Sequence, residues 1–194
     1  MSEKIRLGII GVGNMGSAHA ASIYENKIPG MTLAAVCDIA ASRIAWAKER
    51  LDGVALFEDA SAMIHSGQCD AVLVATPHYG HPPLAIEALK SGLHVLIEKP
   101  AGVSVTQVQR MNQAAEESQK VFGIMFNQRT HPLFQTARQL VRSGSLGAPK
   151  RLQWTVTNWY RTQAYYDSGG WRATWAGEGG GVLLNQCPHQ LDLL

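Results

Sequence analysis

The sequence lacks the features that mark several large classes of protein. It has only three cysteines among 194 residues, Cys37, Cys69 and Cys187, and no two are spaced as a CxxC pair. A disulfide framework and a thiolate zinc site are therefore excluded, and no metal site is expected. No apolar run approaches the roughly 20 residues of a membrane-spanning helix. Because the first residues also lack a signal-peptide core, we expect a soluble, cytoplasmic protein.

An excess of charge of one sign is also missing. The chain has 17 lysines and arginines against 15 aspartates and glutamates, a net charge of +2, and the basic residues form no block. Nucleic acid is therefore not an expected partner. With 46% hydrophobic and 16% charged residues, the composition suits one medium or two small globular domains and excludes disorder, collagen and coiled coil.

What the first two thirds of the chain do contain is an alternation of short apolar runs with longer stretches rich in Ala, Glu, Lys and Gln. The apolar runs are near-continuous, which is typical of strands covered by helices on both faces. This pattern predicts an α/β fold with a doubly wound parallel sheet. The expected strands are Ile5–Ile10, Leu33–Cys37, Ala71–Ala75, His94–Ile97 and Val121–Phe126. The expected helices are Met15–Tyr24, Ala41–Leu51, Ser61–Ser66, Pro83–Ser91 and Thr106–Ser118.

The pattern changes near Lys150. Residues 151–160 alternate as a long strand with one solvated face would, and the chain then becomes rich in Gly and Trp. We expect a first domain over 1–128 that binds a dinucleotide and a second domain that begins at 129, with more antiparallel strands to follow. The chain stops at Leu194 within an apolar helical pattern, so the second domain is expected to be incomplete at its C-terminus.

A glycine motif directly follows the first expected strand and opens a helix: Gly11-Val12-Gly13-Asn14-Met15-Gly16. In a GxGxxG motif the first glycine makes the tight turn, the second admits the pyrophosphate and the third allows the helix to pack on the strand. A plain glycine turn is the alternative, but the preceding strand and following helix favour a Rossmann dinucleotide site.

An acidic residue at the expected distance supports this interpretation. Asp38 ends the second strand, where its carboxylate can accept hydrogen bonds from both ribose hydroxyls and would repel a 2′-phosphate. NAD is therefore the expected cofactor. NADP remains an alternative because Arg43 could reach a 2′-phosphate, although a solvated helix residue is its ordinary role.

Two further motifs follow strand ends, where ligands bind in open α/β sheets. Thr76, Pro77 and His81 follow the third strand, where contacts to the nicotinamide are expected; loop packing is the alternative for His81. Glu98-Lys99-Pro100 follows the fourth strand. A residue before proline is extended, which could aim the Lys99 ammonium into the crevice, whereas an ion-paired strand end is the alternative.

The last motif is the glycine-rich run Gly179-Gly180-Gly181 and the residues after it. If this segment is roughly helical, Asn185 and His189 lie on one face, as do His189 and Asp192, and Pro188 kinks the helix. His189 is then presented to a ligand, although a satisfied core histidine is the alternative.

Together these motifs resemble the Gfo/Idh/MocA family of NAD(P)-dependent sugar and polyol dehydrogenases over the whole chain. The resemblance rests on GxGxxG with a following His19, on the stretch from Ala75 to His81, on Glu98-Lys99-Pro100, on Asn127-Gln128-Arg129 and on the run that ends in His189 and Asp192. It implies a second, α+β domain with an open, mostly antiparallel sheet. It also implies a cis peptide before Pro100 and a homo-oligomer, either dimer or tetramer.

The resemblance assigns roles residue by residue. Lys99 would be the catalytic lysine that contacts the reacting hydroxyl, and His189 the acid/base histidine. In the family an Asp usually precedes this histidine by four residues, but here the residue is Asn185, which cannot accept a proton, so we assign it to substrate binding. The residues assigned to the cofactor are Gly11, Gly13, Asn14, Met15, Gly16, Asp38, Thr76, Pro77, His81, Glu98, Lys99, Pro100 and Asn127.

Aromatic residues gather in the part of the chain that leads to the glycine run. Four of the five tryptophans lie between Trp154 and Trp175, and we assign Trp171 and Arg172 to the substrate because a ring face beside an arginine suits a sugar. Core or interface packing is the alternative. The expected activity is hydride transfer between a secondary alcohol and nicotinamide. Its rivals are a redox-neutral elimination enzyme (a glycosidase, for example) of the same family and a non-catalytic NAD-binding sensor.

Overall fold

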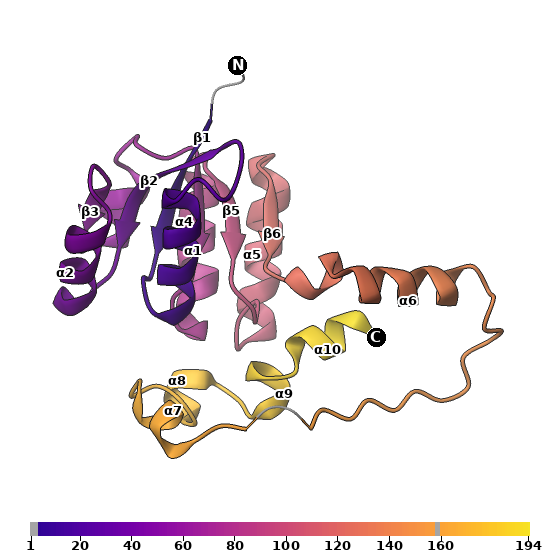
Figure 1. The fold of residues 1–194 in the computed structure, drawn as a ribbon. Helices are drawn as coiled ribbons and strands as arrows, with labels where there is room; N and C mark the ends of the chain where they lie inside the picture. The colour runs from indigo at the N-terminus through magenta and orange to yellow at the C-terminus, as the bar shows by residue number, and fades with distance from the viewer. Residues whose placement is uncertain (1–3, 158–159) are drawn as a thin grey trace. The chain divides into compact units, whose positions relative to one another are not determined.

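The computed structural model describes residues 4–157 and 160–194, which form two units. The first unit runs to Met125 and the second from Phe126 to Leu194. The first is built on a sheet covered by helices, whereas the described part of the second holds helices and irregular segments (Figure 1). No helix within the described ranges is long and apolar enough to cross a membrane.

The sheet of the first unit has six parallel strands in the order β3-β2-β1-β4-β5-β6. The chain builds outward from β1 through β2 to β3, then returns to β4 beside β1 and builds outward in the other direction. The switch point, where ligands bind in such sheets, therefore lies between β1 and β4. The predicted doubly wound sheet is confirmed. Its strands are β1 Ile5–Ile10, β2 Met31–Cys37, β3 Ala55–Phe57, β4 Ala71–Val74, β5 His94–Ile97 and β6 Phe122–Ile124.

Helices cover both faces of this sheet and create two apolar cores. Consecutive strand residues point to opposite faces, so Ile9 belongs to the core beneath α1 and α2, and Ile10 to the core beneath α3, α4 and α5. This double burial explains the near-continuous hydrophobicity of the strands. The helices are α1 Asn14–Tyr24, α2 Ala41–Arg50, α3 Ala60–Ile64, α4 His81–Lys90 and α5 Val105–Ser118.

The five strands expected from the sequence are present, and the sixth, β3, was missed. Its three residues, Ala55–Phe57, lie at the edge of the sheet and pair only with β2. A run this short shows no measurable period, so only its pairing with a neighbour defines it as a strand. The helices also lie where expected, with α4 beginning two residues early at His81.

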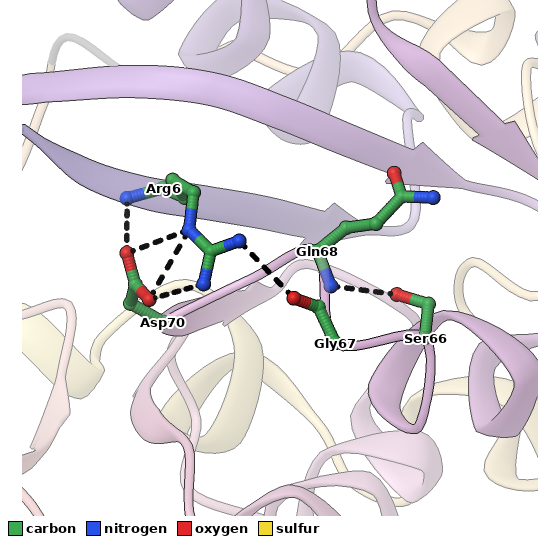
Figure 2. A network of polar contacts seen from close by, with 5 residues as sticks. All are labelled: Arg6, Ser66, Gly67, Gln68 and Asp70. Carbon is green, nitrogen blue, oxygen red and sulfur yellow. Dashed lines mark hydrogen bonds and ion pairs between the residues drawn. The ribbon is translucent and has the colours of Figure 1, made fainter.

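The amino-terminal ends of β1 and β4 are joined by a surface ion pair. The Arg6 guanidinium donates to both carboxylate oxygens of Asp70, at distances from 2.7 to 3.2 Å, and to the Gly67 carbonyl oxygen (Figure 2). The Arg6 backbone N–H donates to Asp70 as well, at 2.8 Å. These hydrogen bonds hold the pKa of Asp70 below its usual value. The same residues fix the register between β1 and the loop before β4.

The second unit differs from expectation. Residues 151–157 and 160, expected to form a long strand, have no strand pairing; 158 and 159 lie outside the described residues. A strand is defined by hydrogen bonds to a neighbour, and no described segment of this unit supplies one. The prediction of a strand here is therefore wrong. The helices of this unit are α6 Pro132–Arg142, α7 Gln163–Asp167, α8 Trp175–Glu178, α9 Val182–Asn185 and α10 Pro188–Leu193.

The segment after the glycine run is two short helices instead of one kinked helix. Pro188 is the first residue of α10 and Cys187 is its N-cap. Proline suits this position because it has no N–H to contribute to a preceding turn. Asn185 therefore ends α9, while His189 lies in α10, and the expected placement of both on one helical face is wrong.

Candidate active site

The glycine loop lies at the carboxyl end of β1, and its three glycines meet different surroundings. Gly11 has a φ of +92°, which favours glycine, and a Cβ there would lie 2.8 Å from the Ala75 carbonyl oxygen. A Cβ on Gly16 would lie 1.8 Å from the Gly11 carbonyl oxygen. These two glycines are required by packing. A Cβ on Gly13 would meet nothing within 4 Å, so that position is open to a ligand.

The start of α1 fits the pyrophosphate of a dinucleotide. Gly13 is the N-cap and has no side chain to cap the helix, so it offers no side-chain acceptor to the first backbone N–H groups of α1. Asn14 and Met15 in this turn are exposed. The N-terminus of a helix carries a partial positive charge and orphan N–H groups, both of which favour phosphate.

Asp38, directly after β2, is held in place by the same loop. One carboxylate oxygen accepts from Val12 N–H at 2.8 Å, and the other accepts from Ala40 N–H at 2.9 Å. Each oxygen has a second lone pair, and the side chain is half-buried. The carboxylate is therefore oriented by the backbone while retaining acceptors for ribose hydroxyls, which fits NAD.

His81 packs between loops, which is the alternative that the sequence left open for it. Its side chain is 1% exposed, with Nε2 2.8 Å from the Thr76 carbonyl oxygen and Nδ1 2.7 Å from the Pro100 carbonyl oxygen. Burial lowers the pKa of His81. The side chain thus faces the protein and joins the loops after β4 and β5, whereas Thr76 and Pro77 lie on the loop that His81 holds. Sequence analysis had assigned His81 to the cofactor itself.

The Glu98-Lys99-Pro100 turn after β5 is held from its other side by α1. Glu98 is 8% exposed; one of its oxygens lies 2.9 Å from His19 Nε2, and the other accepts from Lys99 N–H at 3.3 Å. The peptide bond between Lys99 and Pro100 is cis. Lys99 is therefore carried by a turn whose two ends are bonded to His19 and His81.

In the second unit, Asn185 is buried against an acidic residue that sequence analysis missed. Its amide nitrogen donates a hydrogen bond to Glu178 Oε1, and both residues are 6% exposed. Glu178 is the last residue of the short helix α8, and Gly179, with a φ of +74°, is its C-cap. An acid inside a glycine run was the only sequence signal for Glu178.

Trp171 and Arg172, which are consecutive in the chain, form a cluster with Tyr165. The Arg172 guanidinium lies 4.3 Å from the centre of the Tyr165 ring and 4.8 Å from that of Trp171, and it donates to the Tyr165 hydroxyl at 2.7 Å. Both predicted residues are half-buried. The attraction of the cation to both ring faces holds the Arg172 guanidinium between these two residues.

His189 is half-buried and lies edge-on to Phe126, with 6.0 Å between ring centres. The aspartate three residues on, Asp192, is bound by Arg129, whose Nε donates to it at 2.7 Å and whose Nη2 makes a second hydrogen bond. Sequence analysis noted Arg129 only as part of a motif. Asn127, assigned to the cofactor, is exposed at the start of the same short helical turn, Asn127–Thr130.

Within the described residues, no group of three or more His, Cys, Asp or Glu side chains is arranged to hold a metal ion. Burial, as the main cause, raises the pKa of Cys37 to about 11, and it also raises that of Cys69. These two buried thiols therefore stay protonated at neutral pH and take no part as nucleophiles.

Comparison with known proteins agrees with the motifs. Residues 5–126 match the model of an oxidoreductase family with an NAD-binding Rossmann fold, and residues 134–194 match the GFO/IDH/MocA C-terminal domain. Inositol 2-dehydrogenase of Rubrobacter xylanophilus is 32% identical over 98% of this chain and 51% of its own length. The rhizopine catabolism protein MocA of Rhizobium meliloti is 30% identical over 97% of this chain and 56% of its own.

Solved structures are similar as well. The WlbA dehydrogenase from Bordetella pertussis, in complex with NADH and UDP-GlcNAcA, has a TM-score of 0.86 and 30% identity, covering 100% of this chain and 57% of that one. Scyllo-inositol dehydrogenase from Lactobacillus casei, with NAD(H) and scyllo-inositol bound, has a TM-score of 0.70 and 32% identity over 75% of this chain and 43% of that one. The chain spans about half the length of the curated relatives it matches. Since both of its parts match the family, the chain belongs to the Gfo/Idh/MocA oxidoreductases.

Proposed function

We propose that the protein is an NAD-dependent dehydrogenase that moves a hydride between nicotinamide and a secondary alcohol of a sugar or cyclic polyol. The observation that carries the proposal is the carboxyl end of the sheet, where the open Gly13 position, the oriented Asp38 carboxylate and the braced Lys99 turn follow β1, β2 and β5. Residues 1–128 act in this proposal as the dinucleotide-binding domain. Residues 129–194 begin the substrate and oligomerisation domain.

The first unit supplies the cofactor contacts. The first turn of α1, with Asn14 and Met15, takes the pyrophosphate, and Asp38 accepts the ribose hydroxyls. Gly11 and Gly16 keep the loop and helix close enough for this. Bound NAD supplies the hydride acceptor. Because the Asp38 carboxylate would repel a 2′-phosphate, NAD is preferred to NADP. The loop residues Thr76 and Pro77, the turn residues Glu98, Lys99 and Pro100, and Asn127 complete the proposed cofactor contacts.

Proton transfer is assigned to Lys99 and His189. As hydride leaves the substrate carbon, the alcohol must lose a proton, and negative charge develops on its oxygen. The Lys99 ammonium steadies that charge, and the His189 imidazole takes the proton, a role that histidine commonly has as a general base. Asn185 orients the substrate through hydrogen bonds, while Trp171 and Arg172 contact its ring.

The relatives define the substrates to test. Three of the proteins described above are dehydrogenases named for inositols or bound to UDP-GlcNAcA. The protein should therefore be incubated with NAD or NADP and a panel of inositols, aldoses, anhydrosugars and UDP-GlcNAcA, following the absorbance of the reduced cofactor. Cofactor reduction that depends on one substrate supports the proposal. Lys99→Met and His189→Asn should abolish it, whereas Lys90→Met and His65→Asn, at exposed positions, should not.

Other outcomes point elsewhere. Substrate consumption without net change in the absorbance of reduced cofactor would indicate a redox-neutral elimination enzyme. NAD binding with no turnover of any substrate would contradict the dehydrogenase proposal and favour a sensor, an alternative that the amide at Asn185 already raises. A homo-oligomer and a cytoplasmic location remain predictions, which size-exclusion chromatography with light scattering and cell fractionation would test.

A further inference from the structure

The Asn185 amide has a carboxylate beside it. Glu178 lies seven residues earlier in the chain, yet its side chain meets that of Asn185 in the interior, where both are 6% exposed. A buried carboxylate is costly unless hydrogen bond donors satisfy it. The Asn185 amide nitrogen provides such a donor. The site thus holds an acid and an amide side by side, where an aspartate at position 185 would provide an acid alone.

The segment before Asn185 is built to place this carboxylate. Thr174 caps α8 by accepting from Gly177 N–H at 3.0 Å. A Cβ on Gly177 would lie 2.1 Å from the Trp171 carbonyl oxygen, so only glycine lets the helix pack this closely on the preceding backbone. Gly179 then ends the helix immediately after Glu178. These three features fix the position from which the Glu178 side chain extends.

The hydrogen bond also determines which way the Asn185 amide points. A carboxylate only accepts hydrogen bonds, so the NH₂ group of Asn185 must face Glu178 and its carbonyl oxygen must face away. Without such a partner the two ends of an amide can exchange. Both residues line a cavity of about 340 Å³ together with Tyr166, Trp175 and Gln186. An amide fixed in this way directs its carbonyl oxygen, which is an acceptor, away from Glu178.

We propose that Glu178 is a positioning residue that fixes the Asn185 amide, so that the Asn185 carbonyl oxygen accepts a hydrogen bond from a hydroxyl of the substrate. This inference rests on the proposed function, because it assigns Asn185 to the substrate. An aspartate at 185 would also present an acceptor oxygen. With Asn185 and Glu178 the acceptor oxygen at position 185 is retained. The negative charge lies on Glu178 instead, one side chain farther from the substrate.

A swap of the two groups tests the proposal. Glu178→Gln allows the Asn185 amide to turn around and should lower kcat about tenfold or more, with a smaller change in KM for NAD. Asn185→Asp places two carboxylates in contact and should be similarly impaired. The double variant Glu178→Gln/Asn185→Asp restores one acid and one amide, and should recover most of kcat. Glu116→Gln, at an exposed position in α5, is the matched control and should behave as the wild type.

A second measurement does not depend on turnover. Two carboxylates that share a buried site cannot both ionise, so the pKa of one of them rises. In Asn185→Asp the melting temperature should therefore fall as the pH rises from 5 to 8. In this range the folded protein holds a proton on the carboxyl pair that the unfolded chain does not bind, and this contribution to stability is lost as the proton leaves. The double variant should lose this pH dependence. A structural role alone would produce this coupling in melting temperature without the coupling in kcat.

The outcomes separate the two proposals. Turnover by the wild type with unchanged kcat in Glu178→Gln would overturn the role of Glu178 and leave the proposed function standing. Coupling in melting temperature without coupling in kcat would show a structural pair and would equally overturn the inference. Lack of turnover by the wild type on every substrate would overturn the proposed function and with it the positioning role of Glu178, whereas the melting temperatures would still decide whether the pair forms.

Discussion

Polar side chains are exposed at the amino-terminal end of the parallel sheet and buried at its carboxyl end. At the amino-terminal end, Arg6 and Asp70 form an ion pair whose side chains are 47% and 41% exposed (Figure 2). At the carboxyl end, His81 is 1% exposed and contacts the loops after β4 and β5, while Glu98 is 8% exposed and contacts His19 of α1. Exposed pairs contribute little free energy because water competes for both charges, whereas buried polar groups are costly unless every partner is in place.

The polar contacts at the two ends of the sheet therefore have different roles. The exposed ion pair aligns β1 with the loop before β4, whereas the buried hydrogen bonds hold the loops of the candidate site in one arrangement. The ion pair at the amino-terminal end can break without disturbing the core, since water replaces its hydrogen bonds. At the carboxyl end, the bonds of His19 and His81 connect α1, the loop after β4 and the turn that carries Lys99. Movement of one loop must strain the others. We therefore expect changes at the carboxyl end to have larger effects on stability, and also to affect ligand binding.

The largest effect is expected for Gly16→Ala. Its new Cβ would lie 1.8 Å from the Gly11 carbonyl oxygen, and the backbone must move to admit it. The free energy of unfolding should fall by about 3 kcal/mol or more, as urea titration would measure. Gly13→Ala is the matched control because its Cβ meets no atom within 4 Å. That variant should keep its stability and lose affinity for NAD in a calorimetric titration; equal stability losses in both would contradict the packing argument.

The next largest effect is expected for His81→Leu. The substitution keeps a buried apolar body but removes both ring nitrogens, which lie against the Pro100 and Thr76 carbonyl oxygens and of which the neutral ring donates one N–H. An unsatisfied buried acceptor costs about 1–3 kcal/mol, so the urea midpoint should shift accordingly. His65→Leu, at an exposed histidine, should change stability by less than about 0.5 kcal/mol. If the two substitutions have equal effects, His81 does not brace the loops.

His81 should also make stability depend on pH. Burial lowers its pKa from the ordinary value of 6.5, so below pH 6.5 the unfolded chain takes up a proton that the folded protein resists. The contribution is therefore fully present above pH 6.5 and is lost as the pH falls toward the lowered pKa. Melting temperatures between pH 5 and 8 would show this decline. His81→Gln should reduce it, and an unchanged decline would assign the effect to other groups.

The smallest effect is expected at the amino-terminal end. Asp70→Asn should cost about 0.5–1 kcal/mol, as exposed ion pairs do, and less at high salt. Hydrogen bonds from Arg6 lower the pKa of Asp70, so this contribution is present above the ordinary carboxyl pKa and is lost as the pH falls through the lowered value. Urea titrations at pH 7 and pH 3 would measure both. A loss larger than that of His81→Leu would reverse the comparison.

Much of the first unit could be predicted from the sequence because its signals are local. Apolar runs predict the strands that are buried on both faces, and the spacing of the glycines predicts the turn after β1. The three-residue strand β3 escaped because it carries no period. The expected strand over 151–160 failed for the converse reason: alternation was present, but a strand also requires a partner, and no described residue from Phe126 onward is in a strand.

The site divides along the same line. Residue types and spacing sufficed to place Gly11, Gly13, Gly16, Asp38 and the Lys99 turn at the carboxyl end of the sheet, since each follows a strand end that the apolar pattern locates. The partners of these residues could not be found in this way. Hydrogen bonds between separate elements join His19 to Glu98, and join His81 to Thr76 and Pro100. The Arg129–Asp192 pair joins residues far apart in the chain for the same reason.

By itself, the sequence determined the family, the parallel sheet and the position of the glycine loop, because hydrophobic period and turn chemistry are properties of consecutive residues. Only the tertiary structure decided that His81 supports the loops from inside and that Glu178 lies against Asn185. Those facts depend on burial and on the direction of hydrogen bonds. Both arise when distant segments exclude water from the same place, and no local pattern encodes them.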